Sequence, residues 1–247
     1  MISKAKVKHL KSLQVKKYRK QEQSFLVEGA KSVVELLNSD FEVLWLAGTR
    51  LFLNQNEETL SGIDAEIVEA TDNELALSGS FQSNDGALAV AKMKVNTEAP
   101  IKNEFVLVLD DIRDPGNLGT IIRTADWYGI KKIVASEETA DFYNPKVLNA
   151  SMGSFCRVSM YYTQLVTFLN KSNLPIYGTF LGGTDVHKVK FDNGGLIVIG
   201  NESNGISLAV EKLIAHKITI PRFGNAESLN AAIATGVILD VVRQSKK

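Results

Sequence analysis

The chain has 247 residues, of which 45% are hydrophobic and 23% charged, with 28 basic and 28 acidic side chains. This composition is ordinary for a soluble globular protein of one or two domains, and it excludes a disordered or fibrous chain. No apolar run approaches the length of a membrane helix, and the N-terminus lacks the apolar core of a secretory signal, so we expect a cytoplasmic protein that does not bind membranes.

Although the net charge is zero, basic residues are concentrated at the N-terminus. Residues 1–20 contain eight basic side chains and no acidic one, which leaves 20 basic and 28 acidic side chains in residues 21–247. A basic arm on an acidic body is typical of nucleic-acid-binding proteins, and a solubilising surface helix explains the same pattern. Charge alone leaves both interpretations open.

In the N-terminal part of the chain, short strand-like runs alternate with helical patterns. The predicted strands are Ser24–Glu28, Glu42–Ala47, Asp64–Glu69 and Gly86–Met93, and Ala30–Asn38 is a predicted helix with its apolar residues on one side. The polar stretch 94–104, which contains Pro100, breaks this alternation. We therefore predict a small α/β domain in residues 1–96, with the basic arm at its start, and a linker in residues 97–103.

Beyond the linker the predicted strands are continuous apolar runs: Phe105–Leu109, Ile130–Ala135, Pro175–Phe180, Gly195–Ile199 and Lys217–Ile220. Such strands, when helices separate them, indicate a parallel sheet that is covered on both faces. The clearest helices are predicted from about Asn117 to Tyr128 and from about Ser228 to Gln244. Residues 104–247 are therefore predicted to form a second, larger α/β domain.

Three loops that follow these apolar strands are rich in small and polar residues, at 110–123, 200–207 and 220–230. Ligands of open α/β sheets bind where parallel strands end, so these loops are the candidate site. Single residues within them have ordinary structural explanations as well. Arg123 either pairs with Asp126 or Asp110 or reaches an anion. Glu202 suits a helix N-terminus, and Ser228 suits an N-cap.

Several common catalytic and binding motifs are missing from the sequence. The dinucleotide fingerprint, the phosphate-binding loop and the nucleophile elbow are all absent. The three histidines are isolated, and Cys156 is explained as a small hydrophobic residue of a strand. One cysteine cannot form an intrachain disulfide, and no Cys/His cluster has the spacing of zinc ligands, so no metal is expected.

Taken together, the loop motifs resemble those of the SpoU, or TrmH-type, RNA 2′-O-ribose methyltransferases of the SPOUT superfamily. The first motif, D-P-x-N-x-G-x-x-x-R, matches at Asp114–Arg123, and the second, G-N-E-x-x-G-[IL]-S, matches at Gly200–Ser207. The third consists of Ile220-Pro221 followed by Ser228-Leu229-Asn230. Segment 151–155 and the N-terminal Phe25–Gly29 also resemble segments of this family and of the substrate-binding domain that often precedes it. The resemblance covers nearly the whole chain.

This resemblance implies a particular architecture for the C-terminal domain. Its parallel sheet is expected to form a trefoil knot, and the knot is expected to bind S-adenosylmethionine. The implied contacts are main-chain groups at Thr179, Gly200, Ile220 and Leu229. Enzymes of the family are homodimers whose active sites lie near the knotted interface.

The implied reaction is attack of a ribose 2′-hydroxyl on the sulfonium methyl group, without a metal. Arg123 matches the residue proposed as catalytic in the family. Since an arginine is effectively always protonated, we expect it to bind an RNA phosphate and stabilise the developing alkoxide, while phosphate or water accepts the proton. The remaining implied catalytic residues, expected to orient Arg123 and the ribose, are Asn117, Glu202, Ser228 and Asn230.

The N-terminal domain, by the same resemblance, is an RNA-binding domain, and the basic arm supplies phosphate contacts. Ribosomal RNA is the expected substrate and transfer RNA is the alternative. A non-catalytic RNA-binding protein is a different class of function, but it would have no need of Arg123 and Asn230. A nucleotide-dependent oxidoreductase would need the glycine fingerprint that this chain lacks.

Overall fold

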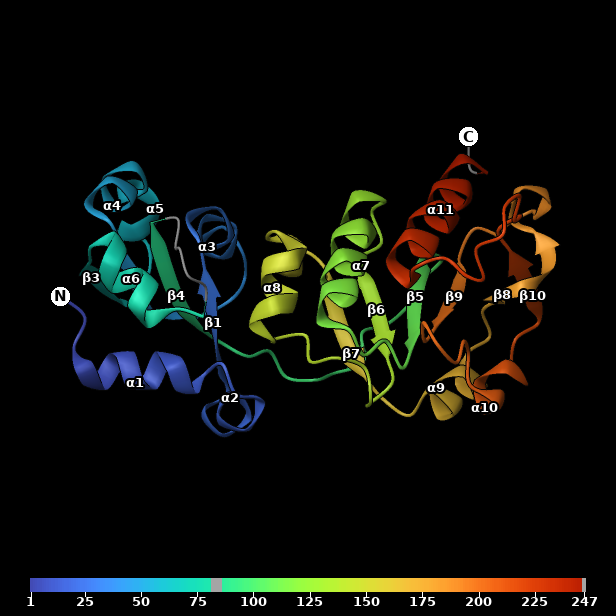
Figure 1. The fold of residues 1–247 in the computed structure, drawn as a ribbon, viewed down its shortest axis with the longest axis horizontal. Coiled ribbons are helices and arrows are strands. Elements are labelled where there is room, and N and C mark those ends of the chain that lie inside the picture. The colour runs from blue at the N-terminus through green and yellow to red at the C-terminus, as the bar shows by residue number, and fades with distance from the viewer. Residues whose placement is uncertain (81–85, 246–247) are drawn as a thin grey trace. The chain divides into compact units, whose positions relative to one another are not determined.

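The computed structural model describes residues 1–80 and 86–245, and within them the chain forms two sheets with helices around each (Figure 1). Contacts divide the chain into two compact units. The first unit comprises Met1–Val95 together with Asp141–Arg157, and the second comprises Asn96–Ala140 together with Val158–Lys247. No helix of the described residues is long and apolar enough to cross a membrane.

The first unit is built on a four-stranded mixed sheet in the order β1 (Ser24–Glu28), β4 (Ala87–Lys92), β2 (Val43–Gly48), β3 (Glu66–Glu69). Strand β4 runs antiparallel to β1 and β2, and β3 runs parallel to β2. All four strands were predicted, with ends that differ by at most two residues. The helices of this unit are α1 (Lys4–Ser12), α2 (Lys16–Glu22), α3 (Ala30–Leu37), α4 (Arg50–Gln55), α5 (Glu57–Ser61), α6 (Asp72–Ser78), α8 (Pro145–Ser151) and the 3-10 helix η1 (Ser154–Cys156).

The basic segment at the N-terminus folds as part of this unit. It forms α1 and α2, and Leu10 and Leu13 are fully buried in a core cluster that also contains Trp45 and Leu88. Ser3 caps α1 by accepting a hydrogen bond from the Lys6 N–H. The segment is therefore a folded layer of the unit, whereas the charge pattern had suggested an arm.

Segment Asp141–Arg157 contributes α8 and η1 to the first unit, although the strands on either side of it in sequence belong to the second. Helix α8 packs against β1, and η1 packs against α3. Between them Met152 and Gly153 both have positive φ angles, 51° and 89°. A Cβ on Gly153 would lie 2.5 Å from Glu35 Cγ, so a glycine is required there both by its backbone angle and by this close approach. Cys156 lies in η1, which corrects the expectation of a strand.

The second unit contains the predicted parallel sheet, with six strands that all run in the same direction. Their order is β10 (His216–Thr219), β8 (Ile176–Asp185), β9 (Gly195–Gly200), β5 (Phe105–Asp110), β6 (Lys132–Ala135), β7 (Ser159–Tyr162). The edge strand β7 was not predicted, because its half-exposed residues do not form an apolar run. The other five were.

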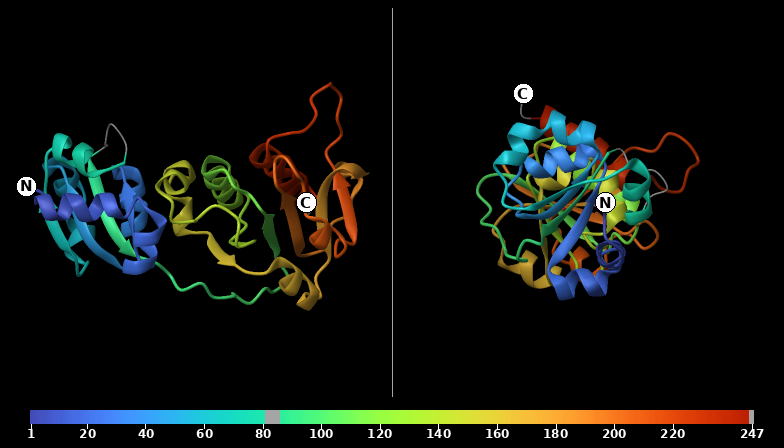
Figure 2. Two further views of the ribbon diagram at one scale, coloured as in Figure 1. Left: turned by 60° about the horizontal axis from the view of Figure 1, so that its bottom comes forward. Right: turned by 90° about the vertical axis from the view of Figure 1, so that its left-hand side faces the viewer.

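Helices cover both faces of this sheet (Figures 1 and 2). Helices α7 (Pro115–Trp127) and α11 (Ala231–Gln244) pack against each other on one face. Helices α9 (Leu165–Lys171) and α10 (Leu208–Glu211) pack on the other, where Val106 and Val108 of β5 share a core with Phe168. The 3-10 helix η2 (Val186–Lys188) follows β8. This arrangement explains why the central strands are apolar without alternation.

The pairing of β8 with β10 changes register within the sheet. Lys217 pairs with Gly178, but the next residue, Ile218, pairs with Thr184. Residues 179–183 therefore leave the ladder between two paired stretches of the same strand. The departure begins at Thr179, immediately after Gly178 pairs with Val198 of β9.

Candidate active site

The first motif loop begins where β5 ends and is closed by the start of α7. Asp114 is the N-cap of α7, and its Oδ1 accepts a hydrogen bond of 2.8 Å from the Asn117 N–H. Pro115 follows in the first turn, where the missing N–H costs no hydrogen bond. These local features fix the Asn117 side chain in the first turn of the helix, near the carboxyl end of the central strand.

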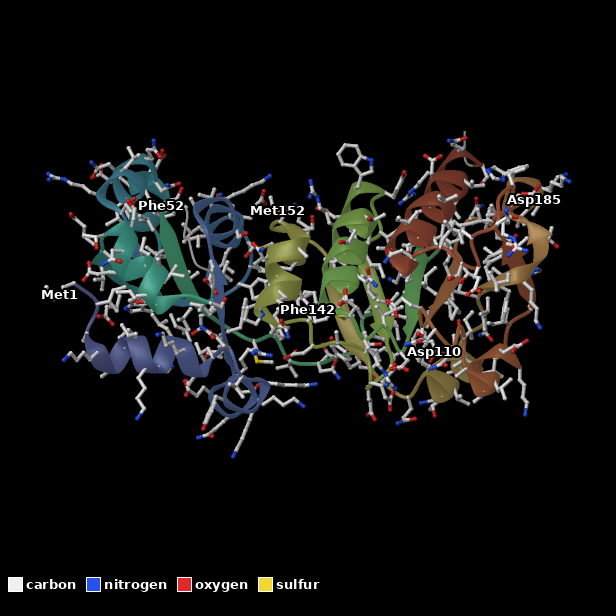
Figure 3. All side chains as sticks on the ribbon, in the orientation of Figure 1. Met1, Phe52, Asp110, Phe142, Met152 and Asp185 are labelled. Carbon is white, nitrogen blue, oxygen red and sulfur yellow. The ribbon has the colours of Figure 1, made fainter. Side chains whose placement is uncertain are left out.

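Two side chains tie the second motif loop to the first. Asn201 Nδ2 donates to the Asp111 carbonyl oxygen at 2.7 Å, and Asn201 Oδ1 accepts from the N–H groups of Ser203 and Asn204. The buried carboxylate of Asp110, labelled in Figure 3, accepts a 2.7 Å hydrogen bond from the Ser207 N–H. The loops after β5 and β9 are therefore held together by hydrogen bonds, and not by apolar packing alone.

The tight turn of the second loop depends on Gly200. A Cβ on this residue would meet the backbone of Gly205 and Ile206 and would lie 2.6 Å from the Gly205 carbonyl oxygen. Asn201 and Gly205 exchange two backbone hydrogen bonds, at 3.0 and 2.9 Å, across the turn. Any other residue at position 200 would force the loop open.

At the centre of the site, one hydrogen-bond chain joins all three motifs. Asn230 Nδ2 donates to Asn117 Oδ1 at 2.9 Å, and Asn117 Nδ2 donates to Glu202 Oε1 at 2.6 Å. Asn230 is also the N-cap of α11, since its Oδ1 accepts from the N–H groups of Ala232 and Ile233. We call Asn117, Glu202 and Asn230 the polar chain. It brings together three of the five predicted catalytic residues.

Arg123 and Ser228, the other two predicted catalytic residues, lie outside the polar chain. Both are exposed, and neither makes a hydrogen bond or ion pair with the described residues. The alternative ion pair of Arg123 with Asp110 or Asp126 is therefore not formed. Ser228 is not an N-cap, because Asn230 holds that position.

The position of Arg123 follows from helix geometry. Six residues separate it from Asn117, which places it about 9 Å further along α7 and roughly 120° around the helix axis. It shares an exposed stripe with Gly116, Thr120 and Trp127. The neighbouring Arg113 differs, because it donates to Asp111 Oδ1 at 2.7 Å, and this hydrogen bond raises the pKa of the Arg113 guanidinium. Arg123 thus forms no ion pair with any residue that the structure describes.

Three of the four predicted cofactor-binding residues lie at one edge of the sheet. Thr179 lies within β8, directly after the pairing of β8 with β9 ends at Gly178. Gly200 ends β9, and Ile220 follows β10. Leu229 lies on the loop 221–229, which projects from α11 in Figure 2 and is exposed almost throughout. That main-chain groups of these four residues bind the cofactor stays a prediction.

Sequence reasoning gave no role to Asn201, and it considered Asp110 only as an ion-pair partner of Arg123. Both belong to the quoted motif loops, but their task is to position the loops. The sequence does contain a signal for them: each is a polar residue at the end of an apolar strand, and two such strands that are neighbours in a parallel sheet bring these residues to the same edge. The described residues contain no group of three or more histidine, cysteine or acidic side chains that would hold a metal.

Known proteins resemble both units. Residues 104–240 match the SpoU rRNA Methylase family, and residues 4–89 match the MRM3-like substrate binding domain. The chain is 30% identical over 241 residues to the 23S rRNA (guanosine(2553)-2′-O)-methyltransferase RlmP of Bacillus subtilis, an alignment covering 95% of this chain and 94% of the relative.

Solved structures give the same result. A TrmH-family protein from Porphyromonas gingivalis superposes with a TM-score of 0.86 at 34% identity, over 99% of each chain. An AdoMet-bound rRNA methyltransferase from Sinorhizobium meliloti superposes with a TM-score of 0.87 at 26% identity, over 96% of this chain and 94% of the other. The predicted family and α/β fold class are confirmed: the chain belongs to the SpoU rRNA methylase family, a family of S-adenosylmethionine-dependent RNA methyltransferases.

Proposed function

We propose that this protein transfers the methyl group of S-adenosylmethionine to a ribose 2′-hydroxyl of ribosomal RNA. The observation that supports this most directly is the polar chain, in which one residue from each of three separate motif loops is hydrogen-bonded to the next. Such a chain fixes the side chains before substrate arrives, so little reorganisation is needed in the transition state. As a ribosomal RNA enzyme, the protein is expected in the cytoplasm.

The cofactor site we propose is the edge formed by Thr179, Gly200, Ile220 and Leu229. The residues fit S-adenosylmethionine, because none of the four carries a charged side chain that would compete with main-chain recognition, and because the tight turn at Gly200 leaves no room for a side chain. When bound, the cofactor supplies a methyl group already activated by its sulfonium. The residues of this chain then have to bind, orient and exclude water, and they have no need of a metal.

In the reaction, a bond forms between the ribose O2′ and the methyl carbon while the bond from that carbon to sulfur breaks, and sulfur keeps the electron pair. The proton of the 2′-hydroxyl leaves to phosphate or water. Glu202 and Asn230 are proposed to orient the ribose through Asn117, and Ser228 to contact it from the third loop. Arg123, whose charge is unpaired, is proposed to bind the RNA phosphate and stabilise the developing alkoxide.

We further propose that the active form is a homodimer built on α7 and α11. These two helices pack side by side, and Trp127, Ile233 and Leu229 leave 84%, 57% and 47% of their area exposed. Apolar side chains exposed to this degree on adjacent elements are typical of an interface. Arg123 lies on the same stripe as Trp127 and on a different side of α7 from Asn117. In a dimer through this face, Arg123 would serve the polar chain of the other subunit.

The substrate assignment rests on the relatives. RlmP acts on 23S rRNA, and a relative from Streptomyces viridochromogenes, 30% identical over 81% of this chain, is a 23S rRNA (uridine(2479)-2′-O)-methyltransferase. Both alignments extend into the N-terminal unit. Transfer RNA is the alternative substrate, and the experiment below distinguishes it from ribosomal RNA.

The test is to incubate the protein with labelled S-adenosylmethionine and RNA from cells that lack the gene, and then to map 2′-O-methylated riboses. We expect label in ribosomal RNA and none with Asn230→Ala. Label in transfer RNA alone would contradict the substrate assignment. If neither free RNA nor ribosomal particles accept label, the proposed activity is wrong.

A further inference from the structure

Helices α1 and α2 present a set of lysines that are held on a folded scaffold. Leu10 of α1 and Leu13, the residue that caps its C-terminus, belong to the core of the first unit and have no exposed area. The lysines at positions 4, 8 and 11 follow the spacing of one helical stripe and are all exposed. Those at positions 16, 17 and 20 of α2 are exposed as well. We call these six residues the lysine face.

The remaining cations of the segment are already occupied. Lys6 lies 3.9 Å from Glu66 and 4.8 Å from the centre of the Trp45 ring. Arg19 is buried and donates to Asp141 Oδ2 at 2.5 Å as well as to two main-chain carbonyl groups. By contrast, none of the six lysines of the lysine face forms an ion pair with a carboxylate of the described residues. Their charges are available to a partner.

The rest of the N-terminal unit has the opposite charge. Residues 1–20 have eight basic side chains and no acidic one, whereas residues 21–95 have four basic and thirteen acidic side chains, and residues 141–157 of the same unit add two basic and one acidic. A polyanion is therefore attracted to α1 and α2 and repelled elsewhere on residues 1–95. This asymmetry fixes which face of the unit a polyanion approaches, and a uniformly charged surface would not do so.

We propose that the lysine face binds the phosphate backbone of the RNA substrate and sets its orientation on the N-terminal unit. This inference rests on the proposed function, since the RNA is the same molecule. Lysine ammonium groups bind phosphate as point charges, so this face supplies affinity that does not depend on base sequence. Lys4 and Lys11 are about 10 Å apart along the α1 axis, which is enough to contact more than one phosphate.

Deleting residues 1–20 would not test the proposal, because Leu10, Leu13 and Arg19 would be removed with the lysines. The test variant instead replaces the six lysines of the lysine face by glutamine, which keeps helix propensity and side-chain length. The control variant replaces six exposed lysines elsewhere, so that the net charge changes by the same amount: Lys31, Lys102, Lys131, Lys171, Lys190 and Lys212.

Binding of a labelled ribosomal RNA fragment is measured between 50 and 200 mM salt by fluorescence anisotropy, alongside S-adenosylmethionine affinity and melting temperature. We expect the lysine-face variant to bind RNA at least ~10-fold more weakly, with the log–log salt slope reduced by ~0.7–0.9 for each phosphate that the variant no longer binds. Cofactor affinity and melting temperature should stay unchanged. The control variant should bind less than about 3-fold more weakly, since diffuse charge contributes little at this ionic strength.

An equal loss of affinity in both variants would overturn the proposal, because net charge alone would then explain binding. Unchanged affinity and slope in the lysine-face variant would overturn it too, as would binding of the lysine face to anionic phosphatidylserine vesicles but not to RNA. Methylation by the unmodified protein separates the two hypotheses. If it methylates ribosomal RNA while the lysine-face variant binds RNA normally, only this inference fails. If it binds RNA through the lysine face but methylates none, only the proposed function fails.

Discussion

Asn117 uses both ends of its side-chain amide, donating to Glu202 and accepting from Asn230. The orientation of this amide is therefore fixed by its two neighbours, and the hydrogen bond to a charged carboxylate is worth about 1.5–3 kcal/mol. Arg123 has no such support from the described residues. Hydrogen bonding thus distinguishes the polar chain, whose residues hold one another in place, from Arg123, which forms no ion pair with the described residues.

Replacing Arg123 by alanine should lower kcat by ~10²–10³-fold, because a donor that stabilises charge in the transition state would be removed. Cofactor affinity and melting temperature should hardly change, since the side chain is exposed and unpaired. Arg123→Lys should recover little activity if the planar guanidinium binds phosphate in two places. Single-turnover methylation and thermal melts of both variants measure this. Full activity of Arg123→Ala would remove the residue from the site.

Cys156 should be unreactive in the folded protein. Burial raises the pKa of its thiol to about 12, so the thiolate that reacts with alkylating agents is scarce at pH 8. We expect iodoacetamide to modify the native protein ~10³-fold more slowly than a cysteine of ordinary pKa, and the rate to rise with pH up to about 12. Mass spectrometry over time measures the rate, and protein in guanidinium is the control. Rapid modification at pH 8 would show that the thiol is accessible and ionised.

The motif loops and segment Asp141–Arg157 are the elements whose placement depends most on contacts between residues far apart in sequence. Each motif loop is short and begins at the end of a buried strand, so hydrogen bonds such as that from Asn201 to Asp111 suffice to fix it. Segment Asp141–Arg157 is anchored differently. The Phe25 ring packs near Tyr143 and Phe155, Arg157 pairs with Glu35, and Arg19 pairs with Asp141.

Breaking the pair between Arg19 and Asp141 should destabilise the first unit strongly. Arg19 leaves about 1% of its area exposed, and the side chain of Asp141 leaves 14%. Removing one partner of a buried pair typically costs about 3–5 kcal/mol, because the other charge, here a largely buried carboxylate, loses its partner. Arg19→Met should therefore lower the urea midpoint markedly, while the double variant Arg19→Met/Asp141→Leu should regain much of the loss. Fluorescence of the buried Trp45, measured in a Trp127→Phe background, reports on this unit.

Lys20→Ala is the matched control for that experiment, since Lys20 is exposed and unpaired on the same helix. It should leave the urea midpoint within experimental error. A small effect of Arg19→Met alone would indicate that the pair is not desolvated, and a double variant no better than the single one would assign the loss of stability to packing or to the main-chain hydrogen bonds of Arg19.

For the whole molecule, the proposed dimer gives a reason why Arg123, which we propose as a catalytic residue, and the polar chain lie on different sides of α7. Within one subunit, Arg123 and the polar chain do not face the same space. In a twofold dimer through the exposed face of α7 and α11, Arg123 of one subunit would lie near the polar chain of the other. The exposed Trp127 and Ile233 would be buried in the same step, and this burial supplies the association energy.

The dimer is tested by complementation. Arg123→Ala and Asn230→Ala should each be inactive alone, but mixing them with subunit exchange should restore about a quarter of normal activity, because half of the molecules are mixed dimers with one intact site each. Sedimentation of Ile233→Glu should show a monomer. No recovery on mixing, with exchange verified by mass labels, would mean that Arg123 acts within its own subunit.

Local patterns in the sequence determined much of this protein. Five of the six strands of the parallel sheet, all four strands of the mixed sheet and the three motif loops were predictable, because burial on two faces gives continuous apolar runs and tight turns need small residues. The family followed from the motifs.

Contacts between residues far apart in sequence were decided by the tertiary structure alone: Asn117 is hydrogen-bonded to Asn230, 113 positions away, and Arg19 pairs with Asp141, 122 positions away. The basic segment is folded because Leu10 and Leu13 find a core that no local pattern reveals. The periodicity of apolar residues indicates which side of a helix or strand is buried, but not which other segment or subunit covers that side. The knot, the role of each site residue and the dimer are of that second kind and stay predictions.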